Sequence, residues 1–352
     1  MLEQSLHHPF AIFGSHLRQY CAFRSLRLSR HAWNGVRAGE DAISSETRRV
    51  TSFWLEEMTD VADITGKHFM ELLTPKQDSL DIEKDLDKFQ ERYRLFLDND
   101  YVICITDNPM GNLSYTAPEV IDGFDLPVNP ENLMIHLNTF HRKTQDRYEP
   151  GKELNEQDLD ILLQHAATMG AKYLLCVSGD GSERLPRLRP EDLGHDPSVV
   201  KTVTSVQLIE YIKKAYPGKF TMGVAFNHYE PFKDEMEKLE RKLAAGACFI
   251  ITQPVAMNEG PDPRIAVANR NLREMLEFAD SRGVQVVLEA WMSQKMANLL
   301  PECVGYDIDF GEFEPYSNLK AMREAFPGRR FYFSMIFGPQ SLQKTESILK
   351  QP

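Results

Sequence analysis

The sequence lacks an excess of basic charge and any apolar run long enough to cross a membrane. Acidic residues outnumber basic ones by 52 to 40 over 352 residues, which gives a formal net charge of -12. Nucleic acids and anionic membranes bind basic surfaces, so neither is expected as a partner. A membrane-spanning helix needs roughly 20 consecutive, mostly apolar residues, and the chain contains no such run.

Clustered cysteines are also missing. The five cysteines are scattered at positions 21, 104, 176, 248 and 303. None lies in a CxxC pair or at zinc-ligand spacing with a histidine, so no metal site is expected. Cys104, Cys176 and Cys248 fall within expected strands. This pattern is typical of small buried thiols in a reducing compartment, which predicts a cytoplasmic protein.

No GxGxxG turn follows an early strand, and no Walker phosphate loop is present. Their absence argues against a dinucleotide-binding fold. What is present, from residue 68 onward, is an alternation of short apolar runs with amphipathic helical patterns. The expected strands are 68–73, 101–106, 133–137, 172–177, 220–225, 248–252, 284–289 and 330–336. The expected helices include 81–97, 117–121, 156–169, 205–216, 263–280, 293–300 and 318–325.

Residues 219–254 show this alternation most clearly. A strand at 220–225 precedes a charged helix with Met236, Leu239 and Leu243 at helical spacing. Gly246 ends that helix, as glycine commonly does. The apolar strand at 248–252 then leads into Thr252-Gln253-Pro254. Polar residues at the carboxyl end of a buried parallel strand are where α/β folds place their chemistry.

The number of expected strands decides between two α/β architectures. An open doubly wound sheet and a closed barrel share the same alternation. An open sheet usually ends near about six strands, whereas eight strand–helix repeats favour a (β/α)8 TIM barrel. We therefore predict a barrel catalytic domain over residues 67–352, with no low-complexity linker dividing it.

Residues 1–66 precede this alternation and are predicted to form an N-terminal helical extension. Residues 1–39 contain one acid, Glu3, and several arginines, a bias that resembles a transit peptide. A helical pattern follows at 44–63, with Ser45 as a plausible N-cap. The segment is either a targeting peptide or an extension that packs on the barrel or on a partner subunit, including a second copy of the chain.

In a barrel, the residues after each strand meet at one mouth. The polar residues expected there are Glu71, Thr74, Thr106, Asp107, Asn108, His136, Asn138, Ser178, Gly179, Asp180, Asn227, His228, Glu230, Thr252, Gln253 and Glu289. The eighth strand contributes mostly apolar residues: Phe333, Met335 and Phe337. The mouth is thus rich in carboxylates, amides and imidazoles but poor in cations.

Each candidate has a structural interpretation beside the functional one. Glu71 lies in the apolar run Phe69–Leu73, where a carboxylate costs several kcal/mol unless paired or protonated, so a functional acid is favoured. Asp180, in a Ser-Gly-Asp-Gly turn, is either a turn residue or a ligand contact. The same alternatives hold for His136 and Gln253. Asp107-Asn108-Pro109 is readily explained as a turn.

Four motifs in order resemble the methylenetetrahydrofolate reductase family. LERKLAAGACFIITQ, ending at Gln253, is similar to that family's helix–Gly-Ala–strand–Thr-Gln segment. Gly179-Asp180 resembles its Arg-Gly-Asp turn, and His136-Leu137-Asn138 its His-Leu-Thr strand. Phe69-Met70-Glu71 followed by Thr74-Pro75 is similar to its Phe-Glu-Phe-Phe-Pro-Pro opening. The resemblance spans about residues 68–300.

The resemblance implies an oxidoreductase of one-carbon metabolism that interconverts 5,10-methylene- and 5-methyltetrahydrofolate, usually through FAD reduced by NAD(P)H. By position, Glu71 would protonate the folate N10 as general acid. Asp180 and Gln253 would hold the pterin, and Asp180 would also stabilise the developing cation. The cofactor-side residues implied are Thr106, His136, Ser178, Gly179, Phe226, His228 and Lys242.

The chain departs from the family pattern at three places. Ser178 stands where the family has arginine, the loop after the fifth strand is shortened to 226–231, and residues 288–292 replace a Pro-Gly-Ile-x-Pro segment. The first two regions serve the flavin, so pterin recognition is better preserved than FAD binding. Glu289 and Trp291 then fall on the substrate side, where Trp291 or Phe226 supplies a stacking face.

Two other functions stay open at this stage. The altered flavin motifs and the N-terminal extension are also consistent with a non-reducing subunit that binds one-carbon folate within a methyl-transfer or demethylation complex. A barrel enzyme of unrelated carboxylate chemistry, such as a lyase, is the third interpretation.

Overall fold

The computed structural model describes residues 66–141, 158–181, 185, 187–257 and 260–351. The predicted extension over residues 1–66 lies outside this range except for Gly66, as do Cys21 and the expected helix 44–63. The domain boundary and the partner contact expected through the extension therefore stay predictions. Within the described residues, no helix combines the length and the apolar character that a membrane crossing requires.

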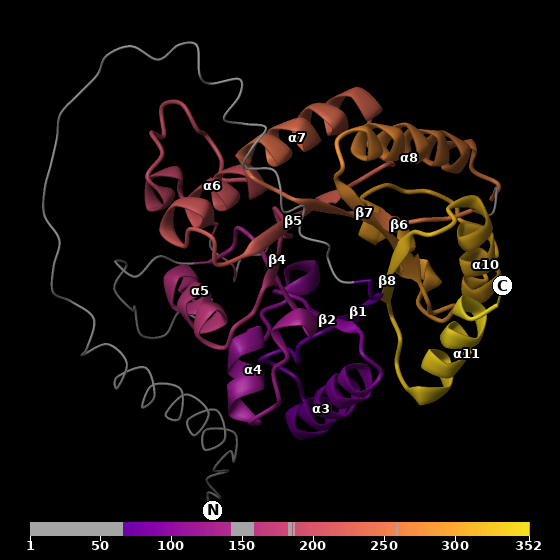
Figure 1. Ribbon diagram of the computed structural model, residues 1–352, viewed down its shortest axis with the longest axis horizontal. Helices are drawn as coiled ribbons and strands as arrows, with labels where there is room; N and C mark the ends of the chain where they lie inside the picture. The colour runs from indigo at the N-terminus through magenta and orange to yellow at the C-terminus, as the bar shows by residue number, and fades with distance from the viewer. Residues whose placement is uncertain (1–65, 142–157, 182–184, 186, 258–259, 352) are drawn as a thin grey trace, which may run out of the picture. The chain divides into compact units, whose positions relative to one another are not determined.

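The strands form a closed parallel barrel in chain order, with β8 pairing back to β1 (Figure 1). The strands are β1 (Phe69–Leu72), β2 (Val102–Ile105), β3 (Leu133–Leu137), β4 (Tyr173–Cys176), β5 (Thr221–Phe226), β6 (Phe249–Pro254), β7 (Gln285–Trp291) and β8 (Arg330–Ser334). The predicted (β/α)8 barrel is confirmed, and β3 has the bounds expected from the sequence.

Helices alternate with the strands along the chain. They are α3 (Ile82–Asp98), α5 (Leu159–Thr168), α6 (Ser205–Ala215), α7 (Phe232–Ala245), α8 (Pro263–Ser281), α9 (Leu300–Val304), α10 (Pro315–Ala325) and α11 (Pro339–Leu349). Residues 118–127, which include most of α4 (Ala117–Gly123), belong to a separate compact unit and are described by themselves.

The barrel is filled by side chains at alternate strand positions. A core cluster joins Phe69, Val102, Met134, Tyr173, Phe249 and Tyr332 with their neighbours, all nearly inaccessible to solvent. Gly223 on β5 leaves the space that the Phe249 ring occupies, since a Cβ there would overlap the ring. Because side chains alternate along a strand, the interior position after the last core residue of each strand lies toward the carboxyl end of the barrel.

Three sequence-based expectations need correction. Cys248 precedes β6 and is exposed, whereas Cys104 and Cys176 are buried as predicted. The helix expected at 293–300 begins later, because Trp291 donates to the Ser293 carbonyl and the chain turns before a 3-10 turn at Ala297–Leu299 and α9. Helix α11 was not predicted; Gly338 and Pro339 mark its start.

Candidate functional site

The carboxyl end of the barrel brings together polar side chains from strands far apart in the sequence. Glu71, His136, Gln253 and Glu289 each lie two residues beyond an interior core residue: Phe69, Met134, Ile251 and Val287 respectively. All four remain partly exposed, unlike the fully buried layer beneath them. They therefore form the floor of the barrel mouth, accessible to a ligand from that end.

The Tyr332 hydroxyl reaches this floor from the buried layer beneath it, and the sequence pattern does not single out this residue. Its hydroxyl donates to Glu71 Oε1 at 3.2 Å and lies 3.3 Å from His136 Nε2. The two rings stack with centroids 6.0 Å apart. Because the Tyr332 hydroxyl donates its proton to Glu71, its oxygen accepts a hydrogen bond from the Nε2–H of the neutral His136 ring. Glu71, Tyr332 and His136 thus form a continuous chain of hydrogen bonds. The eighth strand had been described as mostly apolar, yet it supplies this hydroxyl.

The environment of Glu71 favours its protonated form. Burial raises the pKa of Glu71 from 4.5 to about 7, against the lowering effect of hydrogen bonds from Tyr332 and the Met335 backbone. Burial lowers the pKa of His136 to about 4, with the Asp107 carboxylate opposing the change. At neutral pH the imidazole is therefore neutral, and Glu71 exchanges its proton within the physiological range.

Glu289 on β7 is the second acid of the floor. Burial and then the Glu71 carboxylate raise the pKa of Glu289 well above its usual value, while the Ser334 hydroxyl opposes the rise. Two such acids cannot both ionise at low cost, so the pair carries at most one charge near neutral pH. The Thr252 hydroxyl accepts from the Glu289 backbone N–H at 3.0 Å and aligns β6 with β7 at this level.

Cys303 on α9 is under the electrostatic influence of several carboxylates. Its pKa is raised to about 12, first by burial and then by Glu289, Glu71, Glu302 and Asp180. Electrostatic influence of this kind falls with distance, so Asp180, after β4, and Glu289, on β7, both lie within reach of this thiol. Asp180 itself is exposed, which places its carboxylate at the rim of the mouth.

A buried carboxylate–imidazole pair holds the ends of β2 and β3. Asp107 Oδ2 lies 2.7 Å from His141 Nε2, and both side chains are almost inaccessible. The same oxygen accepts from the Asn138 backbone N–H at 2.8 Å, and the Asn138 amide donates back to the Asp107 carbonyl. Asp107 had been interpreted as a turn residue, and His141 had not been considered. The only feature of the sequence that could have pointed to this pair is that the segments after β2 and β3 are both polar.

The turn after β4 packs tightly against β3. Thr139 donates to the Ser178 carbonyl at 2.7 Å. Gly179 has φ = +73°, and a Cβ there would lie 2.6 Å from the Asn138 Cβ. Only glycine fits this backbone conformation and this approach without strain. Gly179 therefore acts by fixing the turn that presents Asp180.

Four predicted site residues are engaged in packing or in a polar network: Phe226, Trp291, His228 and Lys242. Phe226 is fully buried. Trp291 is 2% exposed in an apolar cluster with α9 residues, and its indole N–H donates to the Ser293 carbonyl. His228 is fully buried, with neither ring nitrogen hydrogen-bonded to a described residue, and its ring contacts Tyr229 at 4.3 Å between centroids.

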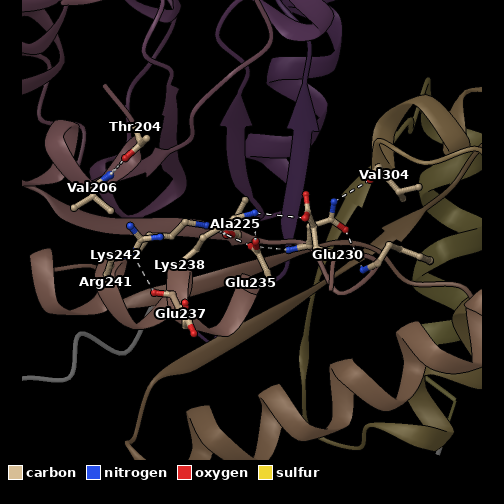
Figure 2. A network of polar contacts seen from close by, with 12 residues as sticks. Thr204, Val206, Ala225, Glu230, Glu235, Glu237, Lys238, Arg241, Lys242 and Val304 are labelled. Carbon is tan, nitrogen blue, oxygen red and sulfur yellow. Dashed lines mark hydrogen bonds and ion pairs between the residues drawn. The ribbon is translucent and has the colours of Figure 1, made fainter. Parts of the chain in front are cut away.

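Lys242 belongs to a buried polar network between α7 and the end of β5 (Figure 2). Its Nζ donates to the Ala225 carbonyl at 2.7 Å and pairs with Glu235 at 3.5 Å. Glu235, 4% exposed, also pairs with Lys238 and accepts from the Asn227 backbone N–H. Burial lowers the pKa of Lys242, and Glu235 opposes this change. The network fixes the β5–α7 loop to its helix.

The residues implied for FAD do not fit the flavin as a set. Thr106 offers a buried hydroxyl without a hydrogen-bond partner among the described residues, as a ligand contact would. Lys242 is instead committed to Glu235 and Ala225, and Phe226 and His228 are inaccessible. The reaction at the barrel mouth is therefore described without a flavin. Among the described residues, no group of His, Cys, Asp or Glu is placed to hold a metal ion.

Fold and mouth together define a (β/α)8 barrel with two carboxyl groups of raised pKa, Glu71 and Glu289, at the carboxyl ends of its strands. The family model described as methylenetetrahydrofolate reductase matches residues 151–259, less than half of the chain. This stretch contains the Gly179-Asp180 turn and the Thr252-Gln253 strand end, so the resemblance is confirmed there. No curated protein matches the sequence.

Solved structures share the fold at low identity. An uncharacterized protein from Clostridium thermocellum, described as binding two copies of 5-methyl-5,6,7,8-tetrahydrofolic acid, is 10% identical with a TM-score of 0.50, covering 83% of this chain and 96% of that one. A dihydropteroate synthase from Clostridium difficile is 14% identical with a TM-score of 0.42, covering 80% of this chain and 95% of that one. At these identities the likeness concerns the fold alone.

Proposed function

We propose that this chain is a one-carbon tetrahydrofolate oxidoreductase that interconverts 5,10-methylene- and 5-methyltetrahydrofolate, with Glu71 as the general acid. The observation that carries the proposal is the Glu71 carboxyl group in the floor of the mouth, hydrogen-bonded to Tyr332, with a pKa raised to about 7 that suits an acid acting at neutral pH. The match to the reductase family and the methyltetrahydrofolate bound by the structural neighbour support the substrate class.

In the reductive direction, Glu71 gives its proton to N10 of the folate. The bond between N10 and the bridging methylene carbon then breaks, leaving an N5 iminium cation. Asp180, exposed at the rim, would stabilise this cation, and the half-buried Gln253 would hold the pterin edge. NAD(P)H would supply the hydride that completes the methyl group. The net reaction consumes one hydride and one proton.

The Tyr332–His136 pair returns the proton to Glu71. After transfer, the Glu71 carboxylate would accept the hydroxyl proton of Tyr332, and the Tyr332 oxygen would take the Nε2 proton of neutral His136 across 3.3 Å while His136 Nδ1 takes up a proton from solvent. Because the pKa of His136 is lowered to about 4, the imidazole passes protons without retaining a charge. Glu289 stays protonated in this scheme, which keeps a second negative charge away from the reacting acid.

Glu71→Gln tests the proposal. It keeps the shape of the side chain, so we expect binding of 5-methyltetrahydrofolate within a few-fold of the wild type and turnover reduced at least 100-fold. Turnover would be followed by NAD(P)H oxidation with methylenetetrahydrofolate. Glu312→Gln, at an exposed glutamate, is the matched control. Wild-type turnover in Glu71→Gln would eliminate the general-acid role.

A second function is favoured because three residues implied for the cofactor are engaged within the protein. Lys242 is held by polar contacts, and His228 and Phe226 are buried. The chain would then bind one-carbon folate without reducing it, as a subunit of a methyl-transfer or demethylation complex. The visible spectrum of the purified protein and an NAD(P)H oxidation assay separate the two. Oxidation of NAD(P)H with methylenetetrahydrofolate by the isolated chain supports the reductase; folate binding without oxidation supports the subunit.

A further inference from the structure

A cavity of about 480 Å³ lies at the opposite end of the barrel from Glu71. Its lining includes His68 before β1, Arg330 at the start of β8, Lys320 on α10, and the apolar residues Phe326, Pro327 and Leu349. The volume falls within the roughly 300–1,000 Å³ typical of small-molecule sites. No part of the proposed reaction uses this end.

The polar lining of the cavity is strongly cationic, although the chain carries a net charge of -12. Arg323 donates to the carbonyls of Ile348 and Gln351, and Arg329 pairs with Asp280, so both are held in place. Lys320 and Arg330 have no hydrogen-bond or ion-pair partner among the described residues, although both line the cavity. Glu324 is the acidic member of the lining and is exposed.

His68 adds a neutral donor to these cations. Its Nδ1 accepts from the Phe331 backbone N–H at 3.1 Å, so the neutral ring carries its proton on Nε2. Stacking on Phe331, with centroids 5.7 Å apart and planes 10° apart, fixes the ring orientation. Burial and then the positive charges of Arg330 and Arg323 lower the pKa of His68 to about 4, in keeping with a positive potential in the cavity.

We propose that this cavity binds a small phosphorylated organic molecule. Arg330, Lys320 and His68 supply three donor groups, which match the three terminal oxygens of a phosphate monoester better than the two oxygens of a carboxylate. Phe326, Pro327 and Leu349 form an apolar surface for the organic part. The site is separate from the mouth and does not depend on the proposed reaction.

Isothermal titration calorimetry on the full chain tests this site, with adenosine monophosphate, adenosine and inorganic phosphate as probes. We expect the monophosphate to bind at least 10-fold more tightly than either other probe. Arg330→Gln and Lys320→Gln should each weaken it at least 10-fold. Lys219→Gln, at an exposed lysine just before β5 on the same face, should leave binding unchanged. Circular dichroism and thermal melting of each variant exclude misfolding.

The results also separate this site from the mouth. Glu71→Gln should bind the monophosphate as the wild type does, because Glu71 lies at the other end of the barrel. Wild-type affinity in both Arg330→Gln and Lys320→Gln would overturn the proposal. So would equal binding of adenosine and its monophosphate, or the absence of binding by the wild-type chain.

Discussion

The hydroxyl of Tyr332 donates a hydrogen bond to Glu71 across 3.2 Å, so the last strand of the barrel supports the acid of the first. This contact lowers the pKa of Glu71 against the larger effect of burial. Tyr332→Phe should therefore move the pKa of Glu71 further upward. The same change breaks the path to His136, and we expect turnover to fall about 10-fold or more.

Two measurements check the Tyr332→Phe prediction. The limb of the pH–rate profile that reports Glu71 should shift to higher pH. The infrared carbonyl stretch of protonated Glu71, assigned by its loss in Glu71→Gln, gives the same pKa without turnover. A profile unchanged from the wild type, or shifted to lower pH, contradicts the role given to the hydroxyl.

Glu71 makes the fold less stable as pH rises. The folded carboxyl group has a pKa of about 7, against 4.5 for an ordinary glutamate in water. Between these values the unfolded chain has released a proton that the folded chain still binds, so the free energy of unfolding decreases through this window. The loss amounts to about 3 kcal/mol. Urea unfolding at pH 5 and pH 8 should show this loss in the wild type and not in Glu71→Gln.

His228 acts in the opposite pH direction. Burial lowers the pKa of its ring from 6.5 to about 3, so the unfolded chain takes up a proton first as pH falls. Stability is thus lost below about pH 6.5, by about 2 kcal/mol at pH 5. His228→Phe should remove this part of the loss. If the free energy of unfolding depended on pH equally in the variant and the wild type, this role of His228 would be refuted. A change in cofactor binding would support the family-derived role instead.

The Lys242–Glu235 pair provides a test of structural against cofactor roles. Lys242→Met leaves Glu235 buried with Lys238 as its remaining ion-pair partner on the helix, and we expect a destabilisation of about 3 kcal/mol. Lys233→Met, from an exposed pair with Glu237 on the same helix, should cost less than about 0.5 kcal/mol. Chemical denaturation measures both. Equal, small effects would indicate that the network contributes little.

Gly194, which ends the 3-10 turn Pro190–Leu193, is a matched control for Gly179 in the turn after β4. Both have positive φ, +78° and +73° respectively, but a Cβ on Gly194 meets nothing within 4 Å. Alanine should cost about 1 kcal/mol at either position through its left-handed conformation. Gly179→Ala should cost about 1–3 kcal/mol more, since its Cβ would press on Asn138. Similar unfolding midpoints for the two variants would contradict the packing described here.

The sequence by itself determined the barrel and the four polar residues of its floor, Glu71, His136, Gln253 and Glu289. The number of strands follows from the periodicity of apolar residues along the sequence. Glu71 stands out because a carboxylate in an apolar strand costs free energy unless it is paired or protonated. Local signals also located Gly246 as a helix end and Gln253 at a strand end. The methylenetetrahydrofolate reductase resemblance rests on such local strings, which is why it could be found without coordinates.

Only the tertiary structure decided what surrounds that acid. Tyr332 lies 261 residues from Glu71, and barrel closure between β8 and β1 brings them together. The Asp107–His141 pair likewise depends on the register of β2 against β3. Lys242 has the sequence position of a cofactor ligand, but the packing of α7 on β5 directs it to Glu235. Residue type and spacing carry no information about such contacts, because closure and helix packing set them.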